Sequence, residues 1–414
     1  MAALQPVRGT HDLLPEEFRA HHRVSETAAR VADRYGYDRI STPVFEFTNV
    51  FSRTLGDTSD VVTKEMYTFT DKGGDQITLR PENTAGVCRA FLSNGLSQHA
   101  PVRYFYAGPM FRYERPQKGR LRQFHQIGIE LIGAPQPAAD VEVIACGAAI
   151  LDELGIRGDT VLELNSLGDT ESRAGYRAAL VEYFSDHAGD LSEDSRDRLQ
   201  RNPLRILDSK DEGDRRLIEN APVFGDYLSS ESTDFFGAVR AGLDTLGIPF
   251  TLNPRLVRGL DYYCHTAFEF TTDKLGSQSA VMAGGRYDGL MEMMGGPATP
   301  GIGWAAGIER LALLAGVPDR PDQPVALVPL GEAAEAACLS LADRLRRQGL
   351  RVDMAFSGNM KKRMRRADKV GASHAVILGD QELERGVAAV KTLTTGDQQD
   401  IVLDSLGDFL KSGQ

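Results

Sequence analysis

Cysteines are few in this 414-residue sequence, and long apolar runs are absent. Cys88, Cys146, Cys264 and Cys338 lie far apart and form no Cys-x-x-Cys pair. This spacing argues against a zinc ribbon or a disulfide scaffold and favours a reducing cytoplasm. No apolar run approaches about 18 residues, so we expect no membrane span. Because residues 1–8 also lack the apolar stretch of a secretory signal, the sequence predicts a cytoplasmic protein.

Two common phosphate-binding signatures are missing as well. Residues 301–310 (GIGWAAGIER) have the glycine spacing of a strand that enters a helix, but the third glycine is one place late for a Gly-x-Gly-x-x-Gly dinucleotide fingerprint. The chain also contains no Gly-x-x-x-x-Gly-Lys-Ser/Thr loop. Any ATP must therefore be bound in another way.

The net charge of −11, taken alone, counts against a nucleic-acid partner. The charge is unevenly distributed, however. Residues 323–414 carry 13 Lys and Arg against 12 Asp and Glu, so the excess of acidic residues lies in residues 1–322. The C-terminal segment is the less repulsive surface for a polyanion.

The proline-rich segment 318–324, with three prolines in seven residues, is the clearest linker in the chain. We place a domain boundary there, between residues 1–322 and residues 323–414. Beyond the linker, strand patterns alternate with the helical patterns of residues 332–348 and about 359–371. This alternation predicts a small, largely parallel α/β domain.

The first domain shows a different pattern. Strands at about 102–114 and 121–132 flank a polar turn, which indicates a hairpin and an at least partly antiparallel sheet. Residues 39–47 alternate like a strand, and Pro43 would place that strand at an edge or an interface because proline donates no hydrogen bond. The charged residues 170–235 predict a helical insertion. A helix is also predicted at 16–35, with an apolar face made of Phe18, Val24, Ala28, Val31 and Tyr35.

One face of the second hairpin strand carries polar side chains on either side of a glycine. Gln126, Gly128 and Glu130 share this face because side chains alternate along a strand. Gly128 would remove bulk where a ligand could lie against the sheet. The alternative is that the polar side chains simply face water. Arg112, near the end of the first strand, favours a site because its planar donors suit phosphate oxygens.

Three further segments contain candidate ligand-binding groups. Residues 79–84 (LRPENT) place Glu82 and Thr84 at a helix start, where they either cap the helix or bind an ammonium group. Residues 284–289 (GGRYDG) predict a flexible, polar turn with an aromatic side chain. Residues 258–263 (RGLDYY) combine a cation, a turn glycine, a carboxylate and two phenols. This mixture suits a small polar ligand beside a negative group.

Together these motifs resemble those of class II aminoacyl-tRNA synthetases. Residues 111–120 (FRYERPQKGR) look like motif 2 of the class, and residues 301–310 are similar to motif 3. The helix at 16–35 with the Pro43 strand looks like motif 1, which builds the dimer interface in that class. The resemblance implies an α+β catalytic domain on a mainly antiparallel sheet.

Within the class, the chain resembles histidyl-tRNA synthetase. Residues 256–263 (LVRGLDYY) and 284–289 look like the two signatures of that family, and residues 202–210 (NPLRILDSK) look like its insertion. The resemblance covers essentially the whole chain. It implies a homodimer and a C-terminal anticodon-binding domain at residues 323–414.

The resemblance also implies a two-step reaction. Histidine and ATP would give histidyl-adenylate and pyrophosphate, and the histidyl group would then move to the terminal ribose of its tRNA. Arg112 and Arg258 are the expected catalytic residues, gripping the α-phosphate from two sides by positioning and electrostatic stabilisation. Mg²⁺ would bridge the phosphates, helped by carboxylates that include Glu114 or its neighbours. The expected ATP-binding residues are Arg112, Glu114, Arg120 and Arg310.

A histidine site follows from the same resemblance. Glu82 and Thr84 would bind the ammonium group, with Gln126 nearby. Glu130 would accept from one imidazole N–H, and Tyr263 would contact the other ring nitrogen. Asn83 departs from the family, which often has glycine there. The expected histidine-binding residues are Glu82, Asn83, Thr84, Arg112, Gln126, Glu130, Arg258, Tyr262, Tyr263 and Tyr287.

A basic run at 359–369 is expected to form a helix in the C-terminal domain. Its apolar side would carry Met360, Met364 and Ala367, and its basic stripe would carry Lys362, Arg365, Arg366 and Lys369. A solvated helix is the usual meaning of such a run. The resemblance instead favours contact with the histidine tRNA.

Three alternatives remain. The first is the synthetase-like regulatory subunit of ATP phosphoribosyltransferase, which lacks the full arginine-bearing signature and the anticodon domain. The second is a glycyl, prolyl or threonyl synthetase, which Glu130 with Tyr262 and Tyr263 argues against. The third is a non-catalytic RNA-binding protein, which Arg112, Arg258 and Arg310 argue against.

Overall fold

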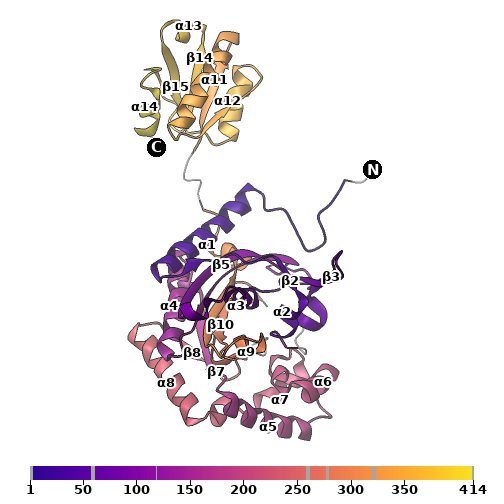
Figure 1. Cartoon of the computed structure of the whole chain (residues 1–414). Helices are drawn as coiled ribbons and strands as arrows, with labels where there is room; N and C mark the ends of the chain where they lie inside the picture. Colours follow the sequence, from indigo (N-terminus) through magenta and orange to yellow (C-terminus); the bar gives the residue numbers. More distant parts are fainter. Residues whose placement is uncertain are drawn as a thin grey trace. The chain divides into compact units, whose positions relative to one another are not determined.

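The computed structural model describes residues 3–56, 61–117, 119–257, 262–276, 279–318 and 323–412. The chain divides into two compact units, Met1–Pro318 and Asp319–Gln414 (Figure 1). Each unit has its own sheet and its own hydrophobic core.

An eight-stranded sheet forms the centre of the larger unit, with the strand order β1-β5-β6-β11-β10-β9-β7-β8. Neighbouring strands are antiparallel except in the edge pairs β1–β5 and β7–β8. The predicted hairpin is the β5–β6 pair, and the sheet is mainly antiparallel, as expected. The strands are β1 (Asp38–Arg39), β5 (Val102–Phe111), β6 (Gln123–Ile132), β7 (Val161–Ser166), β8 (Thr251–Leu252), β9 (Cys264–Thr271), β10 (Ala280–Arg286) and β11 (Gly301–Gly307).

Four helices contribute to the hydrophobic core on one face of this sheet. They are α1 (Pro15–Arg34), α4 (Pro137–Glu153), α8 (Ser230–Thr245) and α10 (Ile308–Ala315). The apolar face of β6 and most of the predicted apolar face of α1 are buried there. Phe18 is an exception, because it is 55% exposed and burial along α1 begins only at Ala20. The first turn of the helix therefore lies outside the core.

The segment predicted as one strand at 39–47 forms two short strands in two sheets. β1 pairs with β5 in the large sheet, whereas β2 (Phe45–Phe47) pairs with β4 (Gln76–Leu79). β4 also pairs with β3 (Tyr67–Thr70), which completes a three-stranded sheet. The prediction of one strand was wrong. Pro43 lies between β1 and β2, where the ladder needs no N–H donor.

The second face of the large sheet packs in another hydrophobic cluster, which includes Tyr106, Tyr262, Tyr263 and Tyr287. This cluster also receives side chains from the predicted insertion, which is helical as expected. Asp169, Ser192, Asp211 and Ser229 cap four of its helices with side-chain oxygens. The remaining helices and helical turns of this unit are α2 (Thr48–Ser52), the π-helix Val61–Glu65, α3 (Thr84–Ser93), Leu96–His99, Arg157–Asp159, α5 (Thr170–Asp186), α6 (Glu193–Arg201), Pro203–Asp208, α7 (Glu212–Glu219), Phe224–Tyr227 and α9 (Leu290–Met293).

The smaller unit holds a five-stranded sheet with the order β13-β12-β14-β15-β16. β12 is parallel to β13 and β14, whereas β15 and β16 add on in antiparallel fashion. The sheet is therefore mixed, and the prediction of a largely parallel one was only half right. Its elements are β12 (Val325–Leu330), α11 (Glu332–Arg347), β13 (Val352–Met354), α12 (Met360–Lys369), β14 (His374–Gly379), α13 (Asp380–Glu384), β15 (Val387–Thr392), β16 (Gln398–Val402) and α14 (Leu406–Ser412).

Helix α12 is the predicted basic helix. Lys362, Arg365, Arg366 and Lys369 are all exposed, as expected. Met360 is also exposed, at 45%, which corrects its predicted place in the core. Arg363 lies there instead, held by the carbonyl oxygens of Gly358 and Pro329 and by the carboxylate of Glu335. No helix in the described part of the chain combines the length and the apolar character needed to cross a membrane.

Candidate active site

A cleft of about 550 Å³ in the larger unit brings together many of the predicted site residues. Its volume lies within the range of roughly 300–1,000 Å³ that is common for ligand pockets. Arg258, with residues 259–261, lies outside the described residues, as does Lys118. The predicted residues that line the cleft are Glu82, Arg112, Glu114, Arg120, Gln126, Tyr263 and Arg310.

Glu82 lies between the end of β4 and the start of α3. Its carboxylate accepts the backbone N–H groups of Thr84, at 2.6 Å, and Ala85, at 3.0 Å. These bonds satisfy two donors at the helix start, so the capping role is present. Burial raises the pKa of this carboxyl group. The side chain of Asn83 bonds to other residues: its Oδ1 accepts from Thr42 at 2.6 Å and from Arg80 at 3.3 Å.

Glu130 is fully buried beneath the cleft and is surrounded by hydroxyl groups. Thr84 donates to its Oε1 at 2.7 Å, and the Tyr287 hydroxyl donates to its Oε2 at 2.5 Å. Burial raises the pKa of Glu130 to about 8 although these hydroxyls oppose the shift. The carboxyl group is therefore not packed into hydrocarbon and retains unused acceptor positions.

Gly128 does not leave an open space for a ligand, which corrects the prediction from sequence. A Cβ atom there would lie 2.3 Å from Cζ and 2.4 Å from the hydroxyl oxygen of Tyr106, and 2.7 Å from the Trp304 carbonyl oxygen. Tyr106 is the cross-strand partner of Gly128 in the β5–β6 hairpin. The missing side chain therefore makes room for the Tyr106 ring, between Gln126 and Glu130.

Three tyrosines form a cluster next to Glu130. The rings of Tyr262 and Tyr263 have centroids 4.5 Å apart, and those of Tyr262 and Tyr287 are 5.9 Å apart. Tyr262 and Tyr287 are buried, whereas Tyr263 also lines the cleft. The structure thus brings together the three phenols predicted to surround histidine.

Residues 284–289 are not a flexible turn. The first three complete β10, and Arg286 is fully buried. Its guanidinium group forms an ion pair with Asp140 of α4 and donates to Asp288 at 3.0 Å and to the Ala134 carbonyl oxygen at 3.1 Å. A buried charge needs such partners, and two of them, Asp140 and Ala134, are distant in sequence. Arg286 therefore holds α4 against the sheet.

Arginines gather on the other side of the cleft. Arg112 donates from Nε to the Pro81 carbonyl oxygen at 2.9 Å, and Arg310 donates from Nη1 to the Ala280 carbonyl oxygen at 2.6 Å. Burial lowers the pKa of Arg310, and the neighbouring Arg120 and Arg112 lower it further. Glu114 forms an ion pair with Arg120. The three guanidinium groups of Arg112, Arg120 and Arg310 make this wall of the cleft suitable for phosphate oxygens.

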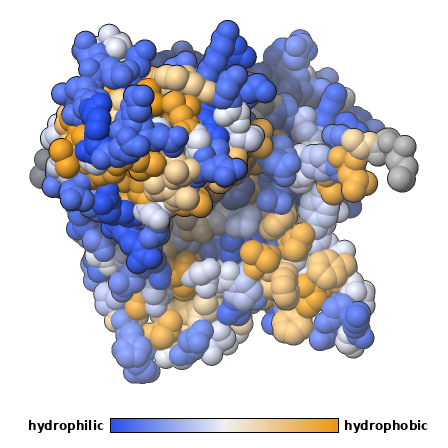
Figure 2. Space-filling model, turned by 90° about the horizontal axis from the view of Figure 1, so that it is seen from above, coloured by the Kyte–Doolittle hydropathy of each residue, from blue (hydrophilic) through white to orange (hydrophobic). Residues whose placement is uncertain are grey.

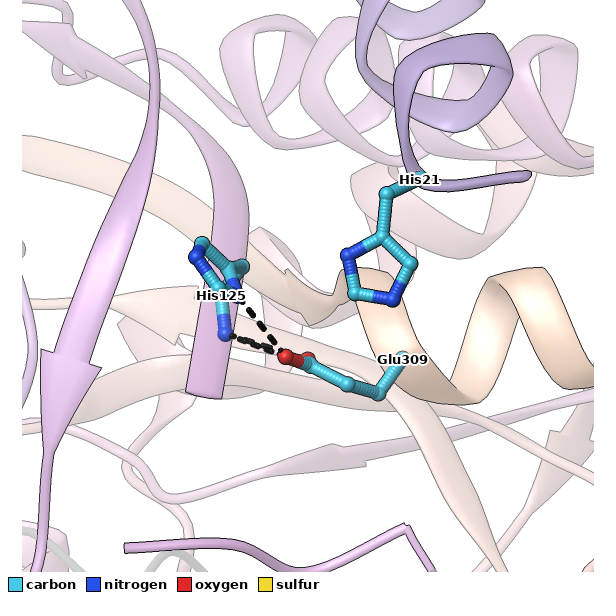
Figure 3. Close-up of side chains that lie close together, drawn as sticks. All are labelled: His21, His125 and Glu309. Atoms are coloured by element: carbon cyan, nitrogen blue, oxygen red, sulfur yellow. Dashed lines mark hydrogen bonds and ion pairs between the residues drawn. The ribbon is translucent and has the colours of Figure 1, made fainter. Parts of the chain in front are cut away.

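Glu309, next to Arg310, is part of a cluster with His125 and His21 (Figure 3). Its carboxylate accepts the backbone N–H of His125 at 2.9 and 3.0 Å, and the His125 Nδ1 lies 2.9 Å from Oε1. Candidate donor atoms of the three residues lie within 4.8 Å of one another. The existing bonds occupy both Glu309 oxygens, so we interpret the cluster as a link between β6 and α10.

Several cleft residues were not predicted from the sequence. Lys210, Glu269 and Glu309 line the cleft, and Tyr106 lies opposite Gly128 on the neighbouring strand. Lys210 belongs to the insertion segment already noted, and Glu309 precedes Arg310, so both could have been considered. The actual register pairs Phe111 with Gln123 and so sets Tyr106 opposite Gly128, one residue away from a register symmetrical about the predicted turn. Glu269 carried no comparable signal.

The profile of the histidyl-tRNA synthetase family matches residues 9–311, and that of the anticodon binding domain matches residues 324–413. The histidine–tRNA ligase of Rhodospirillum rubrum is 61% identical over 412 residues, which covers 99% of each chain. The histidine–tRNA ligase of Gluconacetobacter diazotrophicus is 58% identical over 410 residues, again 99% of each chain. The crystal structure of apo S. aureus histidyl-tRNA synthetase superposes with a TM-score of 0.84 at 37% identity, covering 99% of this chain and 100% of that chain.

These likenesses confirm the predicted class II synthetase-like fold with its C-terminal anticodon-binding domain. They also favour the ligase over the regulatory subunit of ATP phosphoribosyltransferase, because the full-length relatives are ligases by name. The chain belongs to the histidyl-tRNA synthetase family and is an aminoacyl-tRNA ligase.

Proposed function

We propose that the cleft of the larger unit is where histidine reacts with ATP to give histidyl-adenylate, before the histidyl group passes to the 3′ end of the histidine tRNA. The observation that carries this proposal is the juxtaposition of a buried, hydroxyl-bonded carboxyl group, Glu130, with an arginine-lined cleft. The first element suits an imidazole, and the second suits a triphosphate.

The histidine end of the site would use the carboxylates and phenols. Glu82 would bind the ammonium group with Thr84 and Gln126, and Glu130 would accept from an imidazole N–H. Because Glu130 is fully buried, the ring must displace part of the tyrosine cluster to reach it. Tyr263 is the member that lines the cleft, so we expect its side chain to move. Tyr262 and Tyr287 would then close around the imidazole ring. Asn83 would support the site indirectly, through the hydrogen bonds that its side chain accepts from Thr42 and Arg80.

ATP would bind at the arginines that line the cleft, Arg112, Arg120 and Arg310. Arg112 would hold the α-phosphate, Arg120 would contact the phosphate chain, and Arg310 would hold its γ-phosphate end. Arg258 would approach the α-phosphate from the amino-acid side. The attacking carboxylate is already charged, so no general base is needed. Fixed cations can instead offset the charge that grows on the α-phosphate.

Mg²⁺ would join the phosphates in this cleft. Oxygen ligands suit this ion, and Glu114 is a carboxylate in the cleft beside the arginines. Glu114 is paired with Arg120, so binding of the phosphates to that arginine would release the carboxylate for the metal. The ion would supply further positive charge to the phosphates.

The two units would divide the work. Residues 1–322 would carry out catalysis, with the helical insertion at about 170–235, and residues 323–414 would bind the anticodon. The exposed cations Lys362, Arg365, Arg366 and Lys369 support this division because their spacing places them on one face of α12, where they can meet phosphates. Four free cysteines fit a role in the cytoplasm, where thiols stay reduced.

A homodimer is the assembly that we propose. Phe45, Phe47 and Phe69, on the three-stranded sheet, are 54%, 55% and 48% exposed. Three half-exposed aromatic side chains on one small sheet suit a protein interface. Patches of hydrophobic residues also interrupt the otherwise largely hydrophilic surface in Figure 2.

The most direct test is the exchange of labelled pyrophosphate into ATP, measured with each standard amino acid in turn. Histidine alone should support exchange. Exchange supported by glycine, proline or threonine would contradict the assignment of Glu130 and the tyrosines. A lack of exchange with every amino acid would contradict the proposed activation step itself. Arg258→Ala should reduce exchange while leaving histidine binding largely intact.

A further inference from the structure

His21 of α1 is the member of the histidine–glutamate cluster that the link between β6 and α10 leaves unexplained. Its ring stands edge-on to the ring of His125, with centroids 5.7 Å apart. Together with Glu309 the two rings converge from three separate elements (Figure 3), and their candidate donor atoms lie within 4.8 Å of one another. The His21 ring makes no hydrogen bond within the described part of the chain. Its place beside two other ligand-forming groups therefore calls for a reason.

The carboxylate of Glu309 has no permanent cation within ion-pair distance among the described residues. Its side chain is 11% exposed, and its ion-pair partner there is His125, which is charged only when it is protonated. Largely buried carboxylates are normally paired with a cation or bound to a metal ion, because an isolated charge is poorly solvated in the interior. The hydrogen bonds from His125 satisfy the oxygens of Glu309 but do not neutralise its charge.

The contact between His125 and Glu309 already has the arrangement of two ligands to one ion. Nδ1 of His125 lies 2.9 Å from Oε1 of Glu309. Either nitrogen of a neutral imidazole can carry the proton, so a metal ion can bind at Nδ1 while Nε2 is protonated. The bonds from the backbone N–H of His125 to Glu309 would persist, because each carboxylate oxygen has two lone pairs. Metal binding would thus keep the link between β6 and α10.

The donor atoms determine which kind of ion would fit. Imidazole nitrogens suit Zn²⁺ and the neighbouring transition metals, whereas Mg²⁺ and Ca²⁺ prefer oxygen ligands. Two nitrogens and one carboxylate oxygen, with a fourth position left for water, are a common ligand set for zinc. No cysteine belongs to the cluster, so thiolate ligands are not expected.

His21 is the residue that would close the site. Metal–ligand bonds of about 2.0–2.2 Å in tetrahedral geometry place the ligand atoms roughly 3.4 Å apart. Donor atoms that lie within 4.8 Å of one another therefore need to approach by at most about 1.5 Å. The half-buried ring of His21 has no hydrogen bond to break in the described chain, so a small rotation of its side chain can supply this movement.

We propose that His21, His125 and Glu309 bind a divalent transition-metal ion of the zinc class, which ties α1 to β6 and α10. Two of its three protein donors are nitrogens, so the site is chemically distinct from the Mg²⁺ position proposed at the phosphates of ATP. Binding requires neither histidine nor ATP. The inference is therefore independent of the proposed function.

The test is calorimetric titration of Zn²⁺ into the metal-free full chain, prepared without a histidine tag. His21→Phe keeps an aromatic ring beside His125 but removes a ligand, and His22→Phe, at the exposed neighbouring position, is the matched control. The wild type and His22→Phe should bind Zn²⁺ equally well. His21→Phe should bind it at least about tenfold more weakly, since loss of even a supporting group around a metal has an effect of this size.

Two further measurements locate the ion. Co²⁺ should show intensified visible absorption bands when it binds the wild type or His22→Phe, and these bands should be lost in His21→Phe. No thiolate-to-cobalt charge-transfer band should appear. Saturating Zn²⁺ should raise the temperature of thermal unfolding by a few degrees in the wild type and in His22→Phe but not in His21→Phe, because the ion binds only the folded site.

Equal affinity of the wild type and His21→Phe for Zn²⁺ would overturn the proposal, because the ion would then lie elsewhere. A loss in His22→Phe as large as that in His21→Phe, a thiolate band from Co²⁺, or no binding by the wild type would overturn it as well. If His21→Phe unfolds at a lower temperature than the wild type without metal, the titration is repeated with His21→Ala, which introduces no larger side chain. Wild-type affinity in that variant would again place the ion elsewhere.

Discussion

The buried carboxyl group of Glu130 should make the stability of the larger unit depend on pH. Its pKa is raised from 4.5 to about 8 by burial. Between these two values the folded protein holds a proton that the unfolded chain has released. The folded state therefore binds more protons, and the free energy of unfolding falls as the pH rises through this interval.

The size of the effect follows from the same two values. Each pH unit corresponds to about 1.4 kcal/mol, so the interval from 4.5 to about 8 corresponds to at most roughly 5 kcal/mol. Glu82 and the surrounding hydroxyl groups can rearrange as the charge forms, so we expect about 2–5 kcal/mol. Glu130→Gln has no charge to bury, and its amide can still bond to the hydroxyls of Thr84 and Tyr287.

The assay is chemical denaturation of the wild type and Glu130→Gln, side by side, from about pH 5 to about pH 8. The variant should gain stability relative to the wild type as the pH rises, and the difference between the two proteins cancels most other titrating groups. Glu292→Gln, at an exposed position on α9, should run parallel to the wild type. A stability difference between Glu130→Gln and the wild type that does not change with pH would refute the reasoning. The same variant should also raise the KM for histidine by roughly tenfold or more, because an amide NH2 replaces one of the two carboxyl oxygens that can accept the imidazole N–H.

Three more outcomes can be checked directly. Gly303→Ala should impair histidine-dependent exchange more than ATP binding, because its Cβ would lie 2.0 Å from Oε2 of Glu130; normal kinetics would contradict the packing described. Arg310→Ala should raise the KM for ATP by about tenfold or more and leave histidine affinity unchanged, as measured by fluorescence titration; equal losses for both substrates would count against its place at the phosphates. Lys362→Ala and Arg365→Ala should each weaken tRNA binding in a filter assay and reduce the salt dependence by about one unit of slope, whereas an unchanged slope would remove α12 from the RNA surface.

Local patterns were sufficient to predict much of the fold. The β5–β6 hairpin and the passage from β11 into α10 follow from alternation and from glycine spacing in short segments. The strands β15 and β16 were both missed. Residues 398–400 of β16 are polar and exposed, so its pairing depends on a neighbour rather than on its own pattern. The split between β1 and β2 was missed for a similar reason, since each strand is defined by a different partner.

The candidate site was harder to predict where distant residues decide the outcome. Arg286 looked like part of a loop, yet Asp140, far away in the sequence, stabilises its burial. Gly128 was correctly singled out, but the group that fills its space comes from the facing strand. The role of Arg258 stays a prediction. Sequence identifies residues with unusual chemistry, whereas contact with a ligand depends on which face of an element they occupy and what covers it.

The bond between Glu309 and the backbone of His125 has a consequence for how the two substrates meet. His125 is followed by Gln126, proposed for the amino-acid end of the site, and Glu309 is followed by Arg310, proposed for the nucleotide end. Strand β6 and helix α10, joined by this bond, should move together as one rigid unit. In the proposed site this bond would set the spacing between histidine and ATP before either binds, and a change at Glu309, which accepts the backbone N–H, would loosen it without removing a group proposed to contact either substrate.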